Sequence, residues 1–501
     1  MPAKLAGTQP GSTGENPVPP TVQSAAGQPP ETVGDRAFLL GTLALAALAF
    51  GLGLMHIGRN DIWFDEAASF FFARRRGLDF FRVLLSEDTH GPLYYGLLKL
   101  WTLVFGERDW LARLPSVLCA GCAVFVVARL GARLFGRAVG LCAGLMVALS
   151  PFHISYAQEV RFYSFIECMA SLHALCFVSL LGQTTRVSAD PARRSRWPWW
   201  GFVATGTACL LTFYLTGLLL VAEIFCVLLL WKHIERKRVL GAFAAVALVF
   251  SAWLPALIWQ IRHTHGSIKW ILKQPTWKFL SRVCTTFTAG KGATWFDSVV
   301  AVVLVAGAIM TLIHIARRRD RGLLPLFCWF LLPLVAVLII SLRRPLYEPR
   351  YLMMILPAFF LLAAAGLYRV RLRSVRLPLI AAVIIALVIA DVRYYTGYKS
   401  DERWRDAVAL VRREGLATDI VVAVPSYEIA TLTYYLPDFQ HLQGTSWASD
   451  FNRLFVRGHR LWVLSHRQDW RILSQQIARD VMQLDSRNFA SLNVSCFLPV
   501  R

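Results

Sequence analysis

Charge is scarce in this chain. Only 17% of its 501 residues are Asp, Glu, Lys or Arg, while 56% are hydrophobic. A soluble protein of this size could not bury so much apolar surface, so the composition excludes that class and predicts a polytopic membrane protein. Acidic residues are the scarcest charged groups, with 31 against 53 Lys and Arg. Because carboxylates are costly beside hydrocarbon, those next to apolar segments are the first candidates for function.

The cysteines and the distribution of charge disfavour a protein built on disulfides or metal-binding cysteines, and a nucleic-acid-binding protein. Eight of the ten cysteines lie in or at the ends of apolar runs, which leaves too few for a disulfide framework. Cys119 and Cys122 form a C-x-x-C in the middle of such a run, without the second pair or histidines of a metal site. The net charge of +22 comes from short clusters between apolar runs rather than from a basic stripe, so no nucleic-acid partner is expected.

The fold class predicted from these runs is mainly α, a helical membrane bundle with a small α/β domain at the C-terminus. Residues 1–34 are rich in Pro, Gly, Ser and Thr and are expected to be a disordered tail. Residues 35–393 are expected to form the membrane domain, with about eleven spans at roughly 20 residues each. These are expected at 37–57, 112–132, 138–157, 163–182, 197–211, 214–231, 239–261, 295–316, 322–341, 350–368 and 377–393.

The basic clusters give an orientation. With a cytoplasmic N-terminus, every inside connection carries at least three Arg or Lys, as the positive-inside rule requires. Residues 58–111 then form the first outer loop, and Gly91–Phe105 is interpreted as a helix lying in the membrane interface. A true span at Gly91–Phe105 is the alternative, and it would invert the topology downstream.

The same orientation puts residues 394–501 outside, where the pattern changes to that of a small α/β domain. Trp404–Glu414 and Trp470–Arg479 are expected to be helices. Asp419–Val424, Arg460–Leu464 and Phe489–Leu498 are expected to be strands.

An acidic pair, Asp65 and Glu66, follows the first apolar segment. A carboxylate such as Asp65, in a partly desolvated pocket, can take a proton from an acceptor hydroxyl. Glu66 could hold a water, a metal or the acceptor, and neighbours on a helix diverge by about 100°, so both need not reach one atom. The alternative is that Asp65 only caps the helix Glu66–Arg74.

A second acidic site, Glu159, lies at the outer end of a later apolar segment. Glu159 is expected to face Asp65 across a cavity, with Arg161 pairing with a phosphate through its fork of N–H donors. An internal pair of Glu159 with Arg161 is the alternative.

A basic loop lies on the side where basic residues are normally few, which suggests an anionic ligand there. Its candidate phosphate-binding residues are Arg343, Arg344, Arg350 and Tyr351. Contact with lipid head groups is the alternative. His90, at the start of the expected interfacial helix, is a candidate substrate contact or a simple surface residue.

The motifs carrying these residues resemble one family when taken in order. They are Trp63-x-Asp65-Glu66, His90-Gly91-Pro92-Leu93-Tyr94-Tyr95, Arg113-Leu114-Pro115-Ser116, Ser150-Pro151-Phe152-His153 with Gln158-Glu159-x-Arg161, and Pro349-Arg350-Tyr351-Leu352. Over residues 37–400 the chain resembles the bacterial GT-C fold glycosyltransferases related to protein O-mannosyltransferases and to the lipid A aminoarabinose transferase, a glycosyltransferase family 39-like group.

The resemblance implies an inverting glycosyltransferase of the bacterial cytoplasmic membrane, with its C-terminal domain in the periplasm. The donor would be a sugar on a polyprenyl phosphate, and the acceptor an envelope lipid, glycan or protein. Asp65 matches the family's catalytic base, Glu159 an acidic position of the second outer loop, and Arg350 with Tyr351 the pair near the donor phosphate. Relatives often have His-Pro-Pro at His90-Gly91-Pro92, so a looser turn is expected here.

Two readings from other classes remain open from the residues alone. A transporter or flippase of lipid-linked or anionic solutes would also place charged groups at the membrane edge. A non-catalytic membrane scaffold could present the C-terminal domain to a partner. No cofactor is assigned, and a divalent cation is left open because the acidic sites form no dense ligand cluster.

Overall fold

The computed structural model describes residues 32–184, 195–263, 276–290, 292–343, 346–397, 402–416, 418–439, 441–444, 459–466, 469, 474 and 481–499. Residues 1–41 and 42–501 form two compact units, and the boundary between them falls within the first helix. Most of the tail predicted at 1–34, the residue Arg344 and most of the helix predicted at Trp470–Arg479 lie outside the described residues.

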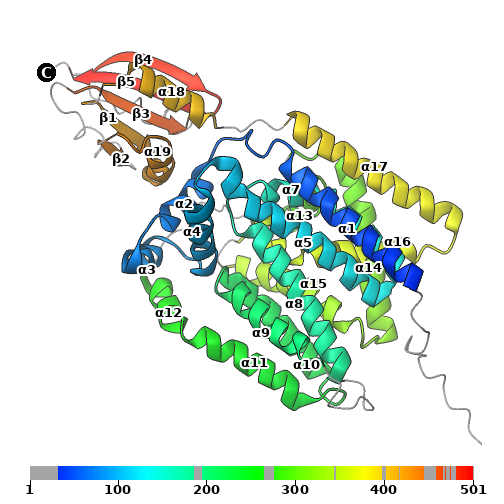
Figure 1. Ribbon diagram of the computed structural model, residues 1–501. Helices are drawn as coiled ribbons and strands as arrows, with labels where there is room; N and C mark the ends of the chain where they lie inside the picture. Colours follow the sequence, from blue (N-terminus) through cyan, green and yellow to red (C-terminus); the bar gives the residue numbers. More distant parts are fainter. Residues whose placement is uncertain are drawn as a thin grey trace, which may run out of the picture. The chain divides into compact units, whose positions relative to one another are not determined.

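Apolar helices make up most of the described chain, and Figure 1 shows α5, α8 and α9 side by side. The helices with their bounds are α1 (Thr32–Leu54), α5 (Asp109–Phe135), α6 (Arg137–Ala148), α7 (Pro151–Ala157), α8 (Tyr163–Thr184), α9 (Trp197–Leu210), η2 (Tyr214–Thr216), α10 (Gly217–Leu229), α11 (Arg236–Ser251), α12 (Leu254–His263), α13 (Thr276–Ala289), α14 (Trp295–Arg318), α15 (Leu324–Ser341), η3 (Pro349–Ile355), α16 (Leu356–Tyr368) and α17 (Arg373–Gly397).

The number of spans is smaller than the sequence predicts. Seven helices of the described residues are long and apolar enough to cross a membrane, or up to nine if each bent pair, α6 with α7 and α11 with α12, is one span. The expected spans 197–211 and 214–231 are short helices of 14 and 13 residues, because the chain turns at Leu211–Phe213 and again at Leu230. The molecule is thus a multi-pass helical membrane protein.

Small residues let the helices of the bundle approach one another closely. A Cβ atom at Gly366 of α16 would lie 2.0 Å from the carbonyl oxygen of Gly307 in α14, so no larger side chain fits there. Close packing of this kind holds helices together in lipid, where the hydrophobic effect does not favour their association. Helix α16 is buried along almost its whole length and forms the centre of the largest apolar core.

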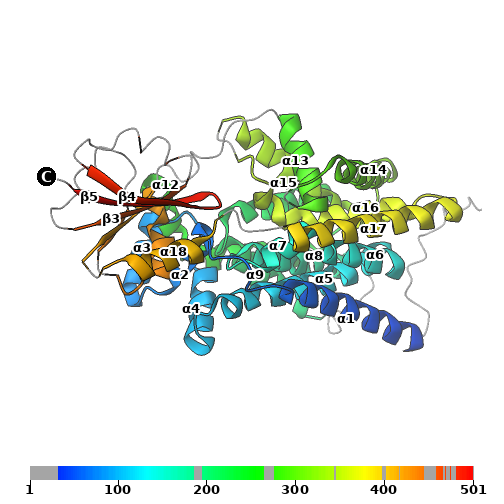
Figure 2. The same ribbon diagram turned by 90° about the horizontal axis from the view of Figure 1, so that it is seen from above.

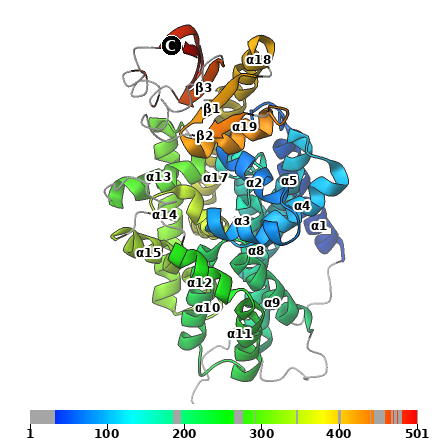
Figure 3. The ribbon, with the colours of Figure 1, turned by 90° about the vertical axis from the view of Figure 1, so that its left-hand side faces the viewer.

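Three short helices follow α1: α2 (Phe64–Ala73), α3 (Gly77–Glu87) and α4 (Leu93–Phe105). Helix α4 has 13 residues, well below the roughly 20 needed to span. Its Tyr95 packs on Phe72 of α2, with ring centroids 5.0 Å apart. Figure 3 shows α12 beside α3. The assignment of α4 to the membrane interface stays a prediction.

The loop before α4 is tightly held rather than loose. Gly91 donates its N–H to the Thr212 carbonyl at 3.1 Å, and Leu93 donates to the Leu211 carbonyl at 3.0 Å. A Cβ atom at Gly91 would lie 2.0 Å from that Leu211 oxygen. Glycine here permits a close backbone contact, so the expectation of a looser turn at His90-Gly91-Pro92 is wrong.

The C-terminal region is a mixed five-stranded sheet with strand order β2-β1-β3-β5-β4. Strand β1 (Ile420–Val424) runs parallel to β2 (Leu442–Gly444) and β3 (Leu461–His466), while β5 (Leu492–Pro499) is antiparallel to β3 and β4 (Val481–Phe489). Helix α18 (Trp404–Glu414) packs on the sheet, as Figure 2 shows, and α19 (Ile429–Tyr435) packs against β1 and β2.

The predicted helix Trp404–Glu414 is confirmed, and two of the three predicted strands match β1 and β3 within two residues. The third, predicted at Phe489–Leu498, overlaps β5, but its first residues belong to the end of β4 and to the turn, where Ala490 has φ 54°. Strand β4 escaped prediction because it is an edge strand, largely exposed and polar, so it lacks the alternating pattern of a half-buried strand.

Helix α19 and the 3-10 turn before it, η4 (Ser426–Glu428), contact α2. The rings of Tyr427 and Phe64 lie 4.8 Å apart, and those of Tyr434 and Phe70 lie 4.9 Å apart. Tyr435 accepts a hydrogen bond at 2.7 Å from the Ile62 N–H, just before α2. The C-terminal region therefore contacts the helix that carries Asp65.

Candidate active site

One cavity of about 280 Å³ gathers charged residues from four parts of the chain. Helix α2 contributes Asp65, the loop between α3 and α4 contributes Asp88 and His90, the turn before α8 contributes Arg161, and η3 contributes Arg350 with Tyr351. Aromatic rings form much of the remaining wall, from Phe64, Phe72, Tyr95, Tyr163, Phe213 and Tyr214. Concave, mostly apolar sites with a few convergent charges are the usual form of a ligand site.

Asp65 is held between two arginines. Its Oδ2 accepts a hydrogen bond at 2.6 Å from Nη1 of Arg350, and its main-chain carbonyl accepts one at 3.1 Å from Nη1 of Arg161. Helix α2 begins at Phe64 with Trp63 as N-cap and no side-chain cap bond. The alternative that Asp65 is only an N-cap is therefore excluded, because its carboxylate points to Arg350 instead.

The surroundings of Asp65 keep it ionised. Burial by itself would raise the pKa of its carboxyl, but the charges of Arg161 and Arg350 and the hydrogen bond from Arg350 outweigh burial and leave the pKa below its ordinary value. The pair is largely enclosed, with side-chain exposures of 12% for Arg350 and 16% for Asp65. The cavity is lined by three carboxylates, Asp65, Glu87 and Asp88, and by two guanidinium groups. Around Asp65 the two guanidinium groups outnumber the one carboxylate, which suits an anion at that place.

A second charged group orients His90. Asp88 accepts hydrogen bonds at 2.6 Å from both the Tyr95 hydroxyl and His90 Nδ1, and at 2.7 Å from the Thr89 N–H. Burial raises the pKa of the Asp88 carboxyl, but the charge of His90, the hydrogen bonds from His90 and Tyr95, and the charge of Arg161 outweigh burial and lower the pKa to about 2. The side-chain amide of Gln260 in α12 also holds this loop, because its Nε2 donates to the main-chain carbonyls of Asp88 and His90. His90 is consequently fixed against the rings of Phe162 and Phe213.

Glu66 lies beside Asp65 in sequence but points elsewhere. Both of its oxygens are engaged by Arg113, at 2.8 Å from Nε and 2.7 Å from Nη2, and its Oε1 also accepts the Val160 N–H at 2.8 Å. Arg113 in turn donates to the main-chain carbonyls of Ile57 and Asn60. The Glu66 and Arg113 side chains are each 1% exposed. This pair joins α2 to α5 and to the turn that carries Arg161.

The predicted site residues separate into two groups. Asp65, His90, Arg161, Arg350 and Tyr351 converge on the cavity. Three others are not among its lining residues: Glu66, Glu159 and Arg343. The Glu159 carbonyl accepts a hydrogen bond from Ser116, and Arg343 is exposed. Arg344 lies outside the described residues. The expected pairing of Glu159 across the cavity from Asp65 is therefore not what the structure shows, and Arg350 is the residue opposite Asp65.

Sequence reasoning missed Asp88 and Tyr95. Asp88 stands two residues before His90, and a pairing over that spacing was a signal available in the sequence. Tyr95 belongs to the helix expected to lie in the membrane interface, yet it is 1% exposed and donates its hydroxyl hydrogen to Asp88.

The cavity does not fit a divalent cation. Within the described residues, the one group of three His, Cys, Asp or Glu side chains whose ligand atoms lie close together is in the C-terminal region, away from this cavity. Asp65 and Asp88 are already committed to Arg350 and to His90 with Tyr95.

The fold and the site together define a polytopic helical membrane protein with a charged cavity. Residues 89–259 match the sequence profile of the family described as dolichyl-phosphate-mannose-protein mannosyltransferase. No curated protein sequence matches the chain. The profile match confirms the resemblance indicated by the motifs.

Solved structures agree with this assignment of the fold. The chain is similar to ArnT from Cupriavidus metallidurans in the apo state, with a TM-score of 0.61 at 14% identity over 92% of this chain and 98% of that one. ArnT bound to undecaprenyl phosphate gives 0.60 at 14% identity, over 93% and 98%. The Archaeoglobus fulgidus oligosaccharyltransferase tethered to an acceptor peptide gives 0.57 at 12% identity, over 87% and 70%. At these identities the likeness establishes the fold.

Proposed function

We propose that the protein transfers a sugar from a polyprenyl-phosphate donor to a hydroxyl of an envelope acceptor, with inversion at the anomeric carbon. The observation that carries the proposal is the meeting of Asp65, Arg161 and Arg350 in one enclosed cavity. A base and a cationic anion-binding pair are the two elements that this reaction needs. The ArnT structure with undecaprenyl phosphate supports the choice of donor.

The arginines are assigned to the phosphate of the donor. In the reaction the bond between the anomeric carbon and the phosphate oxygen breaks, and the lipid phosphate leaves with the electron pair. Arg161 and Arg350 stabilise this leaving group, which is already anionic and needs no proton. Tyr351, adjacent to Arg350 on η3, completes the wall of this part of the cavity.

Asp65 is assigned as the general base. It takes the proton of the acceptor hydroxyl while the hydroxyl oxygen bonds to the anomeric carbon from the face opposite the phosphate. Without substrate, Arg350 keeps Asp65 a weak base. A donor phosphate that shares Arg350 weakens this ion pair and makes Asp65 more basic when both substrates are present.

The other predicted residues receive supporting roles. Glu66 positions Asp65 and Arg161 through Arg113 and Val160. The Glu159 carbonyl helps to fix the same turn through Ser116. We also propose, from the positive-inside bias of the basic clusters, that the cavity and the C-terminal region lie on the outer face of the cytoplasmic membrane.

The reaction is tested with purified protein and a labelled polyprenyl-phosphate sugar. We expect free polyprenyl phosphate to be released in step with the transfer of label to extracted envelope acceptors. A transporter or scaffold would leave the donor intact, so an intact donor in the presence of acceptors contradicts the proposal.

Replacement of Arg350 by alanine should raise the KM for the donor about 10- to 100-fold, because a hydrogen bond to a charged group is worth roughly 1.5–3 kcal/mol. The KM for the acceptor should change much less. Both constants are measured by initial rates at varied concentrations of each substrate. Arg343→Ala is the matched control, since Arg343 is exposed outside the cavity and should leave both constants nearly unchanged. An equal rise in both constants for Arg350→Ala would contradict the phosphate clamp.

A further inference from the structure

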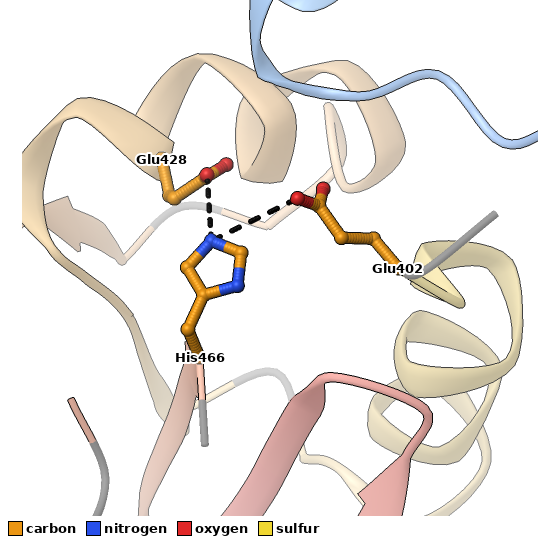
Figure 4. Close-up of side chains that lie close together, drawn as sticks. All are labelled: Glu402, Glu428 and His466. Carbon is orange, nitrogen blue, oxygen red and sulfur yellow. Dashed lines mark hydrogen bonds and ion pairs between the residues drawn. The ribbon is translucent and has the colours of Figure 1, made fainter. Parts of the chain in front are cut away.

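Three polar side chains meet in the C-terminal region, far along the chain from the residues of the cavity. Glu402 precedes α18, Glu428 ends η4, and His466 ends β3, so three separate segments supply them. Figure 4 shows both carboxylates directed at one nitrogen of the His466 ring. One ligand atom from each residue lies within 4.8 Å of the other two.

The separations suit a shared ion. His466 Nε2 lies 3.2 Å from Glu428 Oε1 and 3.9 Å from Glu402 Oε1. Donor atoms bound to a tetrahedral metal at about 2.0–2.2 Å are roughly 3.3 Å apart, so small side-chain movements would bring all three atoms into place. The imidazole nitrogen favours a transition metal over Ca²⁺ or Mg²⁺, which prefer oxygen ligands alone.

Each carboxylate is oriented by a further hydrogen bond. The Thr431 hydroxyl donates to Glu428 Oε2 at 2.7 Å, and the Trp404 indole N–H donates to Glu402 Oε2 at 2.8 Å. In Glu428 and Glu402 this hydrogen bond holds Oε2, and Oε1 is the oxygen that faces His466. Glu428 is only 2% exposed, so its position is fixed by the core around it. Outer hydrogen bonds of this kind are what orient the ligands of protein metal sites.

We propose that Glu402, Glu428 and His466 bind a divalent transition-metal ion, with Zn²⁺ the best fit to one imidazole and two carboxylates. The ion links Glu402, just before α18, to η4 and to the end of β3. Water completes the coordination. The site is structural rather than part of sugar transfer, because none of its ligands lines the cavity.

The test uses the full chain purified in detergent without a histidine tag, stripped with a chelator and dialysed against ZnCl₂. We expect one tightly bound Zn²⁺ per chain, and binding at least about tenfold weaker in His466→Gln and in Glu402→Gln. His459→Gln is the matched control, because His459 donates to the Thr418 carbonyl outside the cluster. Titration with Co²⁺, followed by its visible absorption, reports whether a nitrogen-containing tetrahedral site forms.

Thermal unfolding separates metal binding from folding. Zn²⁺ should raise the unfolding midpoint of the wild type and of His459→Gln but not that of His466→Gln, while chelated samples of all three unfold cooperatively. Equal Zn²⁺ binding by wild type and His466→Gln, or no binding by the chelator-stripped wild type, would overturn the proposal. Both readouts are independent of glycosyl transfer, so failure of one proposal leaves the other standing.

Discussion

Replacing Asp65 with asparagine is expected to lower the rate of sugar transfer about 10²- to 10⁴-fold, the usual contribution of a positioned general base. Asparagine keeps the shape of the side chain and can still contact Arg350, but it cannot accept the proton of the acceptor hydroxyl. The loss should therefore fall on kcat, with the KM for the donor little changed. Single-turnover transfer from labelled donor, at matched amounts of folded protein, measures the effect.

Asp79→Asn is the matched control for this variant. Asp79 lies in the nearby helix α3, and its side chain is half exposed beside Arg75. It should transfer sugar at the rate of the wild type. Transfer by Asp65→Asn within a few fold of that rate would refute the assignment of Asp65 as base and leave the arginines as the main catalytic groups.

The second large effect concerns folding rather than chemistry. Replacing Arg113 with methionine leaves Glu66 buried without its main partner, and breaking a buried ion pair in this way costs roughly 3–5 kcal/mol. Because whole proteins are stable by only about 5–15 kcal/mol, we expect a much lower unfolding midpoint and little protein in the membrane. Thermal unfolding in detergent and membrane yield measure this.

Combining Arg113→Met with Glu66→Leu should recover part of the loss, because the buried charge is then removed as well. Recovery should be incomplete, since the Val160 N–H and the Ile57 and Asn60 carbonyls lose their partners. Arg82→Met, at an exposed position of α3, is the control and should unfold like the wild type. A single variant Arg113→Met as stable as that control would show that the pair is not structural.

The sequence was sufficient for the class of fold and for five of the residues that face the cavity. Composition alone predicts a multi-pass membrane protein, and the rarity of carboxylates at the ends of apolar runs directs attention to Asp65. The arginine opposite Asp65 was found because Arg350 breaks the usual charge bias of its loop. The divergence of neighbouring residues on a helix predicts that Asp65 and Glu66 need not share one site, and their different partners agree with this.

What the sequence could not supply were pairings between distant segments. Glu66 with Arg113 and Asp65 with Arg350 are separated by 47 and 285 residues, and no local pattern encodes them. The count of spans also depends on bends, such as the 61° between α6 and α7, that a run of apolar residues does not reveal. Arg343 and Arg350 were grouped because they share a loop, yet only Arg350 reaches the cavity, because η3 carries it inward.

The contact of Tyr427 with Phe64 joins the C-terminal region to the wall of the cavity. Phe64 lines the cavity and directly precedes Asp65, while Tyr427 directly precedes Glu428 of the proposed metal site. A change in the position of Tyr427 would therefore act first on Phe64, one residue away from Asp65.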